Sequence, residues 1–403
     1  MRAYVRFIGD NRRLLAFGVL LCGLSGSGQT FLIALFGPAL RGEFDLGNAA
    51  FGSLYSAATL ASGLLLLWAG ALIDRMPLAQ FTTLVMAGAG LGALLLAASP
   101  AWWVAGLALF LLRLCGQGLM THLAQTSMAR YFEAGRGKAL GLAALGLPLG
   151  EAVFPLLVVT GNAMLGWRFT WLTIAVVLLA FLPLLLTLIR VPPAAANAAA
   201  STSADRTASS TPAWRRGDVL RDPRFYAVLA TLLAPPFIVT GLFIHQASLA
   251  EAKGWTMAQL ASSFVFYAGG HVVALLTAGP LVDRFRSAAL LPVMLGPMAV
   301  ALALLCAFDG VWLAPVYLAL AGLTVGGAGT LFGAIWPRLY GVRHLGAIRA
   351  VAQASMVLAT AMAPAAIGAV LDQGIAWQAI TVAMLVFLAT ATGVAAAALR
   401  GAA

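Results

Sequence analysis

Two side chains of opposite charge stand inside long apolar segments, Arg113 and Glu151. Arg113 lies 14 residues before Ser127, which directly follows its segment, and Glu151 lies 14 residues after Gly137, where the next segment begins. With a helical rise of 1.5 Å per residue, both lie about 21 Å from those ends. A guanidinium binds carboxylates, and a buried carboxylate is able to take up a proton. The spacing predicts an anion-binding or proton-coupling site, with a permanent salt bridge between the two segments as the alternative.

Other polar side chains occur at similar depth. His271 lies near the middle of its apolar segment, and His245 lies near the end of another. Histidine exchanges protons near neutral pH, so both are candidates for substrate contact or proton relay. A neutral histidine bonded to a neighbouring helix is the alternative for each. Gln29 and Thr30 lie in the middle of the first segment, where they either contact a substrate or bond across helices.

A charged motif occurs twice, 209 residues apart. Gly70, Asp74 and Arg75 reappear as Gly279, Asp283 and Arg284, each time at the end of an apolar segment. The same offset relates Gly118 to Gly327, Tyr131 to Tyr340, Gly137 to Gly346 and Pro155 to Pro364. Basic residues of other loops are candidates for pairing with the aspartates of the motif: Arg136 with Asp74, and Arg343 or Arg349 with Asp283. Solvated loop charges, worth about 0–1 kcal/mol per pair, are the alternative.

The elements that carry these residues are apolar segments of membrane-spanning length. Hydrophobic residues form 62% of the chain and charged residues 9%, whereas soluble domains have roughly 25% charged residues. About 20 apolar residues cross the hydrocarbon layer as a helix. The predicted segments are 14–40, 48–73, 80–98, 102–126, 137–160, 167–189, 225–250, 256–281, 287–308, 311–336, 346–371 and 377–399.

The fixed offset divides these segments into two similar halves in the same orientation, a duplication found in one class of secondary transporter. We therefore predict an all-α membrane protein with twelve transmembrane helices in two six-helix bundles. The predicted domains are residues 1–190 and 223–403, joined by a flexible cytoplasmic linker, 191–222, which is rich in Ala, Ser, Thr and Pro. Within the segments, Pro235 and Pro236 predict an interruption of the seventh.

The net charge of +11 marks topology rather than a nucleic-acid partner. All but four of the 24 Lys and Arg residues fall on one side when the N-terminus is cytoplasmic; the exceptions are Arg41, Arg113, Arg168 and Lys253. This asymmetry follows the positive-inside rule and predicts that both termini are cytoplasmic. The first apolar segment is too long for a signal peptide and is expected to stay in the mature protein. The composition is compatible with a bacterial inner-membrane protein.

The motif Gly70-x-x-x-Asp74-Arg75 resembles the loop 2–3 signature of the major facilitator superfamily, and its second copy matches loop 8–9. The twelve segments, the repeat and the linker extend this resemblance over almost the whole chain. It implies that Asp74 with Arg136, and Asp283 with Arg343, latch the cytoplasmic ends of the two halves when the cavity faces outward. Gly70 and Gly279 then allow the close helix approach that such a gate needs.

A narrower resemblance lies in the stretch from Tyr131 to Gly150 and in the stretch from Trp336 to Gly346. Both are similar to the monocarboxylate porters and their oxalate–formate exchanger relatives. In addition, Arg113-x-x-Gly116-Gln117-Gly118 resembles a segment-four signature of proton-coupled facilitators. These resemblances imply a small organic anion as substrate, moved with protons or by exchange.

Three functions follow in order of preference. The first is a secondary transporter of a small organic anion, such as a monocarboxylate, and the second is a proton-driven exporter of amphipathic or drug-like compounds. A membrane sensor built on a transporter fold comes last. We expect no enzyme activity, because the chain has no Gly-x-x-x-x-Gly-Lys-Ser/Thr phosphate loop. No cofactor, metal or nucleic acid is expected; the expected partners are a small-molecule substrate, protons and the lipid bilayer, and the chain is expected to be a monomer.

Overall fold

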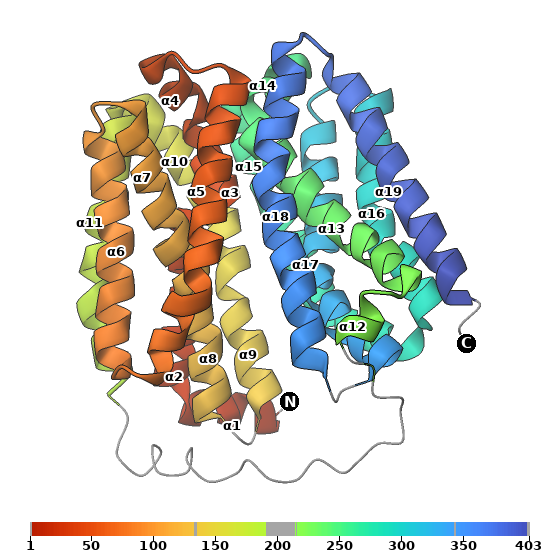
Figure 1. Cartoon of the computed structure of the whole chain (residues 1–403). Coiled ribbons are helices and arrows are strands. Elements are labelled where there is room, and N and C mark those ends of the chain that lie inside the picture. The colour runs from red at the N-terminus through yellow and green to blue at the C-terminus, as the bar shows by residue number, and fades with distance from the viewer. Residues whose placement is uncertain (1, 133–134, 191–213, 215, 342–343, 401–403) are drawn as a thin grey trace. The chain divides into compact units, whose positions relative to one another are not determined.

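The structure is a computed structural model of the 403-residue chain. It describes all residues except 1, 133–134, 191–213, 215, 342–343 and 401–403. Most of the predicted linker, together with Arg343 of the predicted gate, therefore lies outside the described residues. The described residues form helices and no strands (Figure 1).

Eleven helices of the described chain are long and apolar enough to cross a membrane, and there are twelve if one bent pair counts as a single span. The bent pair is the first span, in which Arg12–Gly28 and Thr30–Phe44 meet at 42°. The twelve segments predicted from the apolar runs agree with this pattern, and the all-α membrane fold is confirmed.

In the first half, the helices are α1 (Arg2–Asp10), α2 (Arg12–Leu24), η1 (Ser25–Gly28), α3 (Thr30–Ile33), η2 (Ala34–Phe36), α4 (Gly37–Phe44), α5 (Asn48–Ala69), η3 (Gly70–Asp74), α6 (Leu78–Ala98), α7 (Trp102–Leu111), η4 (Leu112–Met120), α8 (Thr121–Tyr131), α9 (Arg136–Ala144), α10 (Gly146–Leu165) and α11 (Trp167–Leu188). The second half contains α12 (Arg216–Val219), α13 (Pro223–Ile244), α14 (Gln246–Ala252), α15 (Met257–Arg284), α16 (Ser287–Ala307), α17 (Leu313–Tyr340), α18 (Leu345–Asp372) and α19 (Trp377–Arg400).

Contacts divide the chain into two compact units. Unit 1 comprises Met1–Ala39 and Ala57–Arg206, and unit 2 comprises Leu40–Ser56 and Thr207–Ala403. Within the first half the units divide at two places, between Ala39 and Leu40 inside α4 and between Ser56 and Ala57 inside α5. The first nine residues of α5 thus pack with residues of the second half.

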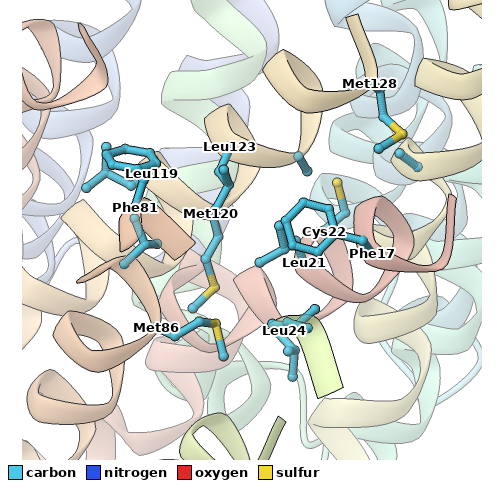
Figure 2. Packing of buried hydrophobic residues seen from close by; sticks show 14 of the residues in the cluster. Phe17, Leu21, Cys22, Leu24, Phe81, Met86, Leu119, Met120, Leu123 and Met128 are labelled. Atoms are coloured by element: carbon cyan, nitrogen blue, oxygen red, sulfur yellow. The ribbon is translucent and has the colours of Figure 1, made fainter. Parts of the chain in front are cut away.

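Unit 1 is built on a core of apolar side chains from α2, α6, η4 and α8 (Figure 2). Phe17 and Leu21 of α2, Phe81 of α6 and Met120 of η4 are all fully buried. Methionine adapts its flexible side chain to irregular gaps, which suits a core where helices of different geometry meet.

The opposite faces of the helices are apolar as well. Leu67 is 69% exposed, Met164 77% and Leu276 68%. In water such surfaces would favour aggregation, whereas in a bilayer they contact lipid chains that are as apolar as they are. The exposed surface thus agrees with a protein embedded in a membrane.

In unit 2, α15 and α17 pack closely along glycines. A Cβ added at Gly270 would collide with the carbonyl of Ala319, and one at Gly322 would collide with the carbonyl of Tyr267. Small residues let helix backbones approach each other in membranes, where dispersion contacts replace the hydrophobic effect. This pair of helices fixes the position of His271 on α15.

The predicted interruption at Pro235 and Pro236 is wrong. α13 continues through both prolines, and the seventh span breaks nine residues later at His245, between α13 and α14. Neighbouring helices and local adjustment satisfy the backbone groups that proline frees in a membrane helix, so a proline pair does not by itself end the helix.

Candidate functional site

The first span of unit 1 is broken in its middle. A short 3₁₀ turn, η1, ends at Gly28, Gln29 adopts an extended backbone (φ −80°, ψ 152°), and helix resumes at Thr30. Such a break interrupts the regular hydrogen bonding of the span, and the freed carbonyls need other donors. Broken membrane helices of this kind bind substrates and ions in transporters.

Arg113 supplies donors at this break. Its Nη1 lies 3.4 Å from the Gly28 carbonyl oxygen and 3.3 Å from Thr30 Oγ1. The side chain is buried, with 5% of its surface exposed. The structure thus brings together Arg113 and Thr30, two of the residues that the sequence predicts for a site.

The segment that carries Arg113 is also irregular. η4 is a run of π-helical turns from Leu112 to Met120, a rare form that often marks functional sites. Gly28 packs directly on it: an added Cβ would collide with the Leu112 carbonyl and would lie 2.5 Å from Gln117 N. Glycine at Gly28 therefore permits the backbone contact that places the arginine beside the break.

Glu151 lies on α10, a helix that contacts both η1 and α3. Its side chain is buried, with 3% of its surface exposed. The approach of α10 again uses glycines, because a Cβ added at Gly150 would lie 3.0 Å from the Gly23 carbonyl oxygen. Arg113 and Glu151 therefore stand on two elements that pack against the same break.

His245 marks the break in the seventh span. Its Nε2 lies 2.8 Å from the carbonyl oxygen of Pro364 on α18. A carbonyl oxygen only accepts hydrogen bonds, so Nε2 carries the proton and donates it. The buried ring thus joins two helices, which is the alternative that the sequence left open for this residue.

His271 lies on α15, buried against the glycine-rich face of α17. Its ring makes an edge contact with Tyr267 at 6.2 Å between centroids, and a Cβ added at Gly326 would lie 2.8 Å from the ring. Both histidines lie in unit 2, His271 on α15 and His245 between α13 and α14. Gln29 is half-buried at the break in unit 1.

The first copy of the charged motif has a different partner from the predicted one. Asp74 forms an ion pair with Arg130 of α8, whose Nη1 also lies 3.4 Å from the Ile73 carbonyl oxygen. The predicted partner, Arg136, is exposed at the start of α9. The Arg130 guanidinium thus binds both the carboxylate and a helix-end carbonyl.

The second copy has a similar arrangement, but among the described residues Asp283 forms no ion pair. Arg338 of α17 donates to the carbonyl oxygens of Val282 and Phe285 at the end of α15. Val282 is the repeat equivalent of Ile73. In both halves, therefore, an arginine at the end of the fourth span donates to carbonyl oxygens at the end of the second span. A Cβ added at Gly70 would lie 3.5 Å from the His122 ring, whereas one added at Gly279 would meet no atom within 4 Å. Arg75, Asp283 and Arg284 are exposed.

Arg130 and Arg338 are the residues that sequence reasoning missed. Both stand in the last turn of their helices, where basic residues stabilise free carbonyls. Their positions differ by 208 residues rather than 209, so a search at the fixed offset does not align them.

Comparisons with known proteins agree with this architecture. The model of the Major Facilitator Superfamily matches residues 15–270. A crystal structure of a bacterial homolog of the human lysosomal transporter Spinster, inward-facing and unoccupied, has a TM-score of 0.69 at 15% identity and covers 97% of each chain. The nucleoside transporter NupG has a TM-score of 0.68 at 14% identity, covering 97% of this chain and 98% of its own. No curated protein matches the sequence.

Proposed function

The chain belongs to the major facilitator superfamily, and from that premise we propose that it moves a small organic anion across the membrane by alternating access. Family and fold make it a secondary transporter rather than an enzyme. Its substrate is proposed from the site. The observation that carries the proposal is the buried guanidinium of Arg113 at the break in the first span.

A buried cation needs an anion or several acceptors to offset its desolvation. Among the acceptors of Arg113 are the Gly28 carbonyl and the Thr30 hydroxyl, neutral groups at 3.4 and 3.3 Å, which is long for hydrogen bonds to a charged donor. A carboxylate offers shorter, bidentate bonds to the same fork. A short monocarboxylate therefore suits Arg113, as the resemblance to the monocarboxylate porters implies.

We propose Glu151 as the proton-coupling group. It is buried and lies on a helix that packs against the same break. A carboxylate there competes with the substrate for the guanidinium, and its protonation would release Arg113 for the substrate. Proton uptake would then accompany anion binding, which gives symport. The basic residues gathered on one side support cytoplasmic termini and a bacterial inner membrane, and we propose that the protein acts as a monomer.

The test is uptake of radiolabelled lactate, formate, oxalate and succinate into proteoliposomes, with and without an imposed pH gradient. Wild type is compared with Arg113→Gln and Arg113→Lys. Losing charge-assisted bonds should lower the transport rate of Arg113→Gln by about 10- to 100-fold, with partial recovery in Arg113→Lys. The matched control is Arg221→Gln, which removes an exposed arginine and should transport normally.

Glu151→Gln tests the coupling separately. It should lose stimulation by the pH gradient but keep exchange of internal for external anion, because exchange needs no net proton movement. Glu251→Gln, at an exposed glutamate, is the matched control. Failure of well-folded wild type to take up any of the acids would contradict the organic-anion proposal. Amphipathic export substrates and, given the likeness to NupG, uridine would be tried next.

A further inference from the structure

A pocket of about 410 Å³ opens beside the junction of α1 and α2 in unit 1. Its polar lining includes Asn11, Arg12 and Arg13 at the junction and Arg190 just beyond the end of α11. Leu14 and Leu188 form its apolar part. None of the residues that line the pocket belongs to η4 or to the break in the first span, and the transport mechanism does not use it.

The charges in this pocket are unbalanced. Three arginines line it against one described carboxylate, that of Asp10. All three arginines are exposed, and none takes part in an ion pair among the described residues. Guanidinium groups with free donors in one concave site bind phosphate, which they match in geometry and charge.

The depth of the pocket favours a lipid over a soluble ligand. Arg12 is the first residue of α2 and Leu188 the last residue of α11, so the pocket lies at the level where two apolar spans end. Phospholipid headgroups occupy this level of a bilayer. The half-buried Leu14 and Leu188 would adjoin the acyl region while the arginines face the phosphate.

The junction is held in place by α1. Phe7 packs against Phe132 with tilted rings at 5.5 Å between ring centroids, and Lys138 Nζ lies 5.9 Å from the centre of the Phe7 ring. Asn11 Nδ2 donates to the Phe7 carbonyl oxygen at 2.9 Å. Gly135 allows this docking: its φ of +87° is unfavourable for other residues, and an added Cβ would lie 3.0 Å from the Phe7 ring. The turn that presents Arg12 and Arg13 is thus fixed before a ligand binds.

We infer that this pocket binds the phosphate headgroup of an anionic phospholipid, such as phosphatidylglycerol. Anionic lipids are attracted to basic clusters at the cytoplasmic ends of spans, by about 1 kcal/mol per Lys or Arg. Arg12, Arg13 and Arg190 hold the phosphate, and Leu14 and Leu188 contact the glycerol and upper acyl chain. The bound lipid would join α2 to α11, which are the first and last spans of the first half.

The test is native mass spectrometry of the full chain released from detergent with phosphatidylglycerol or phosphatidylcholine added. Wild type should retain one phosphatidylglycerol more strongly than phosphatidylcholine. The double variant Arg12→Gln/Arg190→Gln should bind it about tenfold more weakly. The control Arg221→Gln/Arg286→Gln removes the same charge from two exposed arginines of unit 2 and should bind like wild type.

A second arm adds inorganic phosphate and glycerol 3-phosphate and measures thermal stabilisation. Stabilisation by phosphatidylglycerol, without an effect of the soluble phosphates at the same concentration, is expected. Equal stabilisation by the soluble phosphates would overturn the lipid assignment. Equal losses in the pocket and control variants would show that only net charge matters, and would also overturn it. Melting of each variant without lipid verifies that it is folded.

Discussion

At the scale of single residues, the site depends on close backbone contacts at glycine, which any side chain at that position would prevent. The guanidinium of Arg113 meets the break only because Gly28 lets the two backbones touch. The burial of Arg113 and Glu151 follows from the sequence, since both stand within apolar runs. The partners of Arg113 do not follow from the sequence, because they depend on the break in the first span. The residues Ser25–Gly28 are equally compatible with an ordinary packed helix.

We expect Gly28→Ala to damage the site without changing any polar group. The new methyl group would collide with the Leu112 carbonyl, and the backbone of η4 would have to move. Overpacking of this kind lowers the free energy of unfolding by about 1–3 kcal/mol. Thermal unfolding in detergent and lactate uptake measure the two effects. Gly141→Ala, with open space around it, is the control; an equal loss there would contradict the explanation.

His245 is expected to act as a structural donor. His245→Leu leaves the Pro364 carbonyl without its donor and should lower the free energy of unfolding by about 1–3 kcal/mol. His245→Gln keeps a donor and should recover part of that loss. Because the hydrogen bond and not the charge matters, transport by His245→Gln should keep the pH profile of wild type. A shifted profile would instead make His245 part of a proton relay.

At the scale of elements, the number of spans follows from the apolar runs because length and hydropathy alone determine which helices cross a membrane. Their irregularities do not follow. No distinctive residue composition marks the π-helical turns of η4, and α13 continues through Pro235 and Pro236. The first spans of both halves are broken, at Gln29 and at His245, positions that the 209-residue offset does not align.

The start of α13 provides a pH-dependent test. Asp222 caps this helix: its carboxylate accepts from the Arg224 backbone N–H at 3.0 Å, from the Arg224 guanidinium and from the Tyr340 hydroxyl at 3.3 Å. Burial acts to raise the pKa of Asp222, but these hydrogen bonds and the charge of Arg224 together hold it below its ordinary value. The folded protein therefore favours the ionised carboxylate.

A pKa lowered by folding contributes stability above the unfolded value of about 4, and this contribution disappears as the pH falls through the folded value. Asp222→Asn should therefore be less stable than wild type by about 1–2 kcal/mol at pH 7. The difference should shrink below pH 4. Unfolding temperatures of both proteins between pH 7 and 3 measure it, with Glu251→Gln as control. A difference that is constant over this range would contradict the role of the charge.

At the scale of the whole molecule, the repeat is visible in the sequence because the two copies of Gly-x-x-x-Asp-Arg keep their spacing. The sequence predicts the division of the chain at the linker. Contacts group residues 40–56 with the second half. No sequence pattern indicates this grouping, since it arises from contacts such as that of Gly52 with the Pro364 carbonyl.

Asp372 stabilises the packing of residues 40–56 with the second half. Its carboxylate accepts from the backbone N–H of Asn48 at 3.0 Å and of Ala49 at 2.8 Å, and so caps the start of α5 from 324 residues away. Asp372→Ala should speed hydrogen exchange at these two amides several-fold and lower the free energy of unfolding by about 1 kcal/mol. Exchange measured by mass spectrometry over the peptide 45–56 checks this. Unchanged exchange would show that the amides are protected by other means.

This cap has a consequence for synthesis. Asn48 leaves the ribosome 324 residues before Asp372, which at 5–20 residues per second is about 15 to 65 seconds earlier. During that time the start of α5 has no permanent partner. A gene cut at the linker would give two fragments, and the second would lack a segment of its own packing unit. Pulse-labelled nascent chains should therefore acquire protease resistance around residues 40–56 only after α18 has been made.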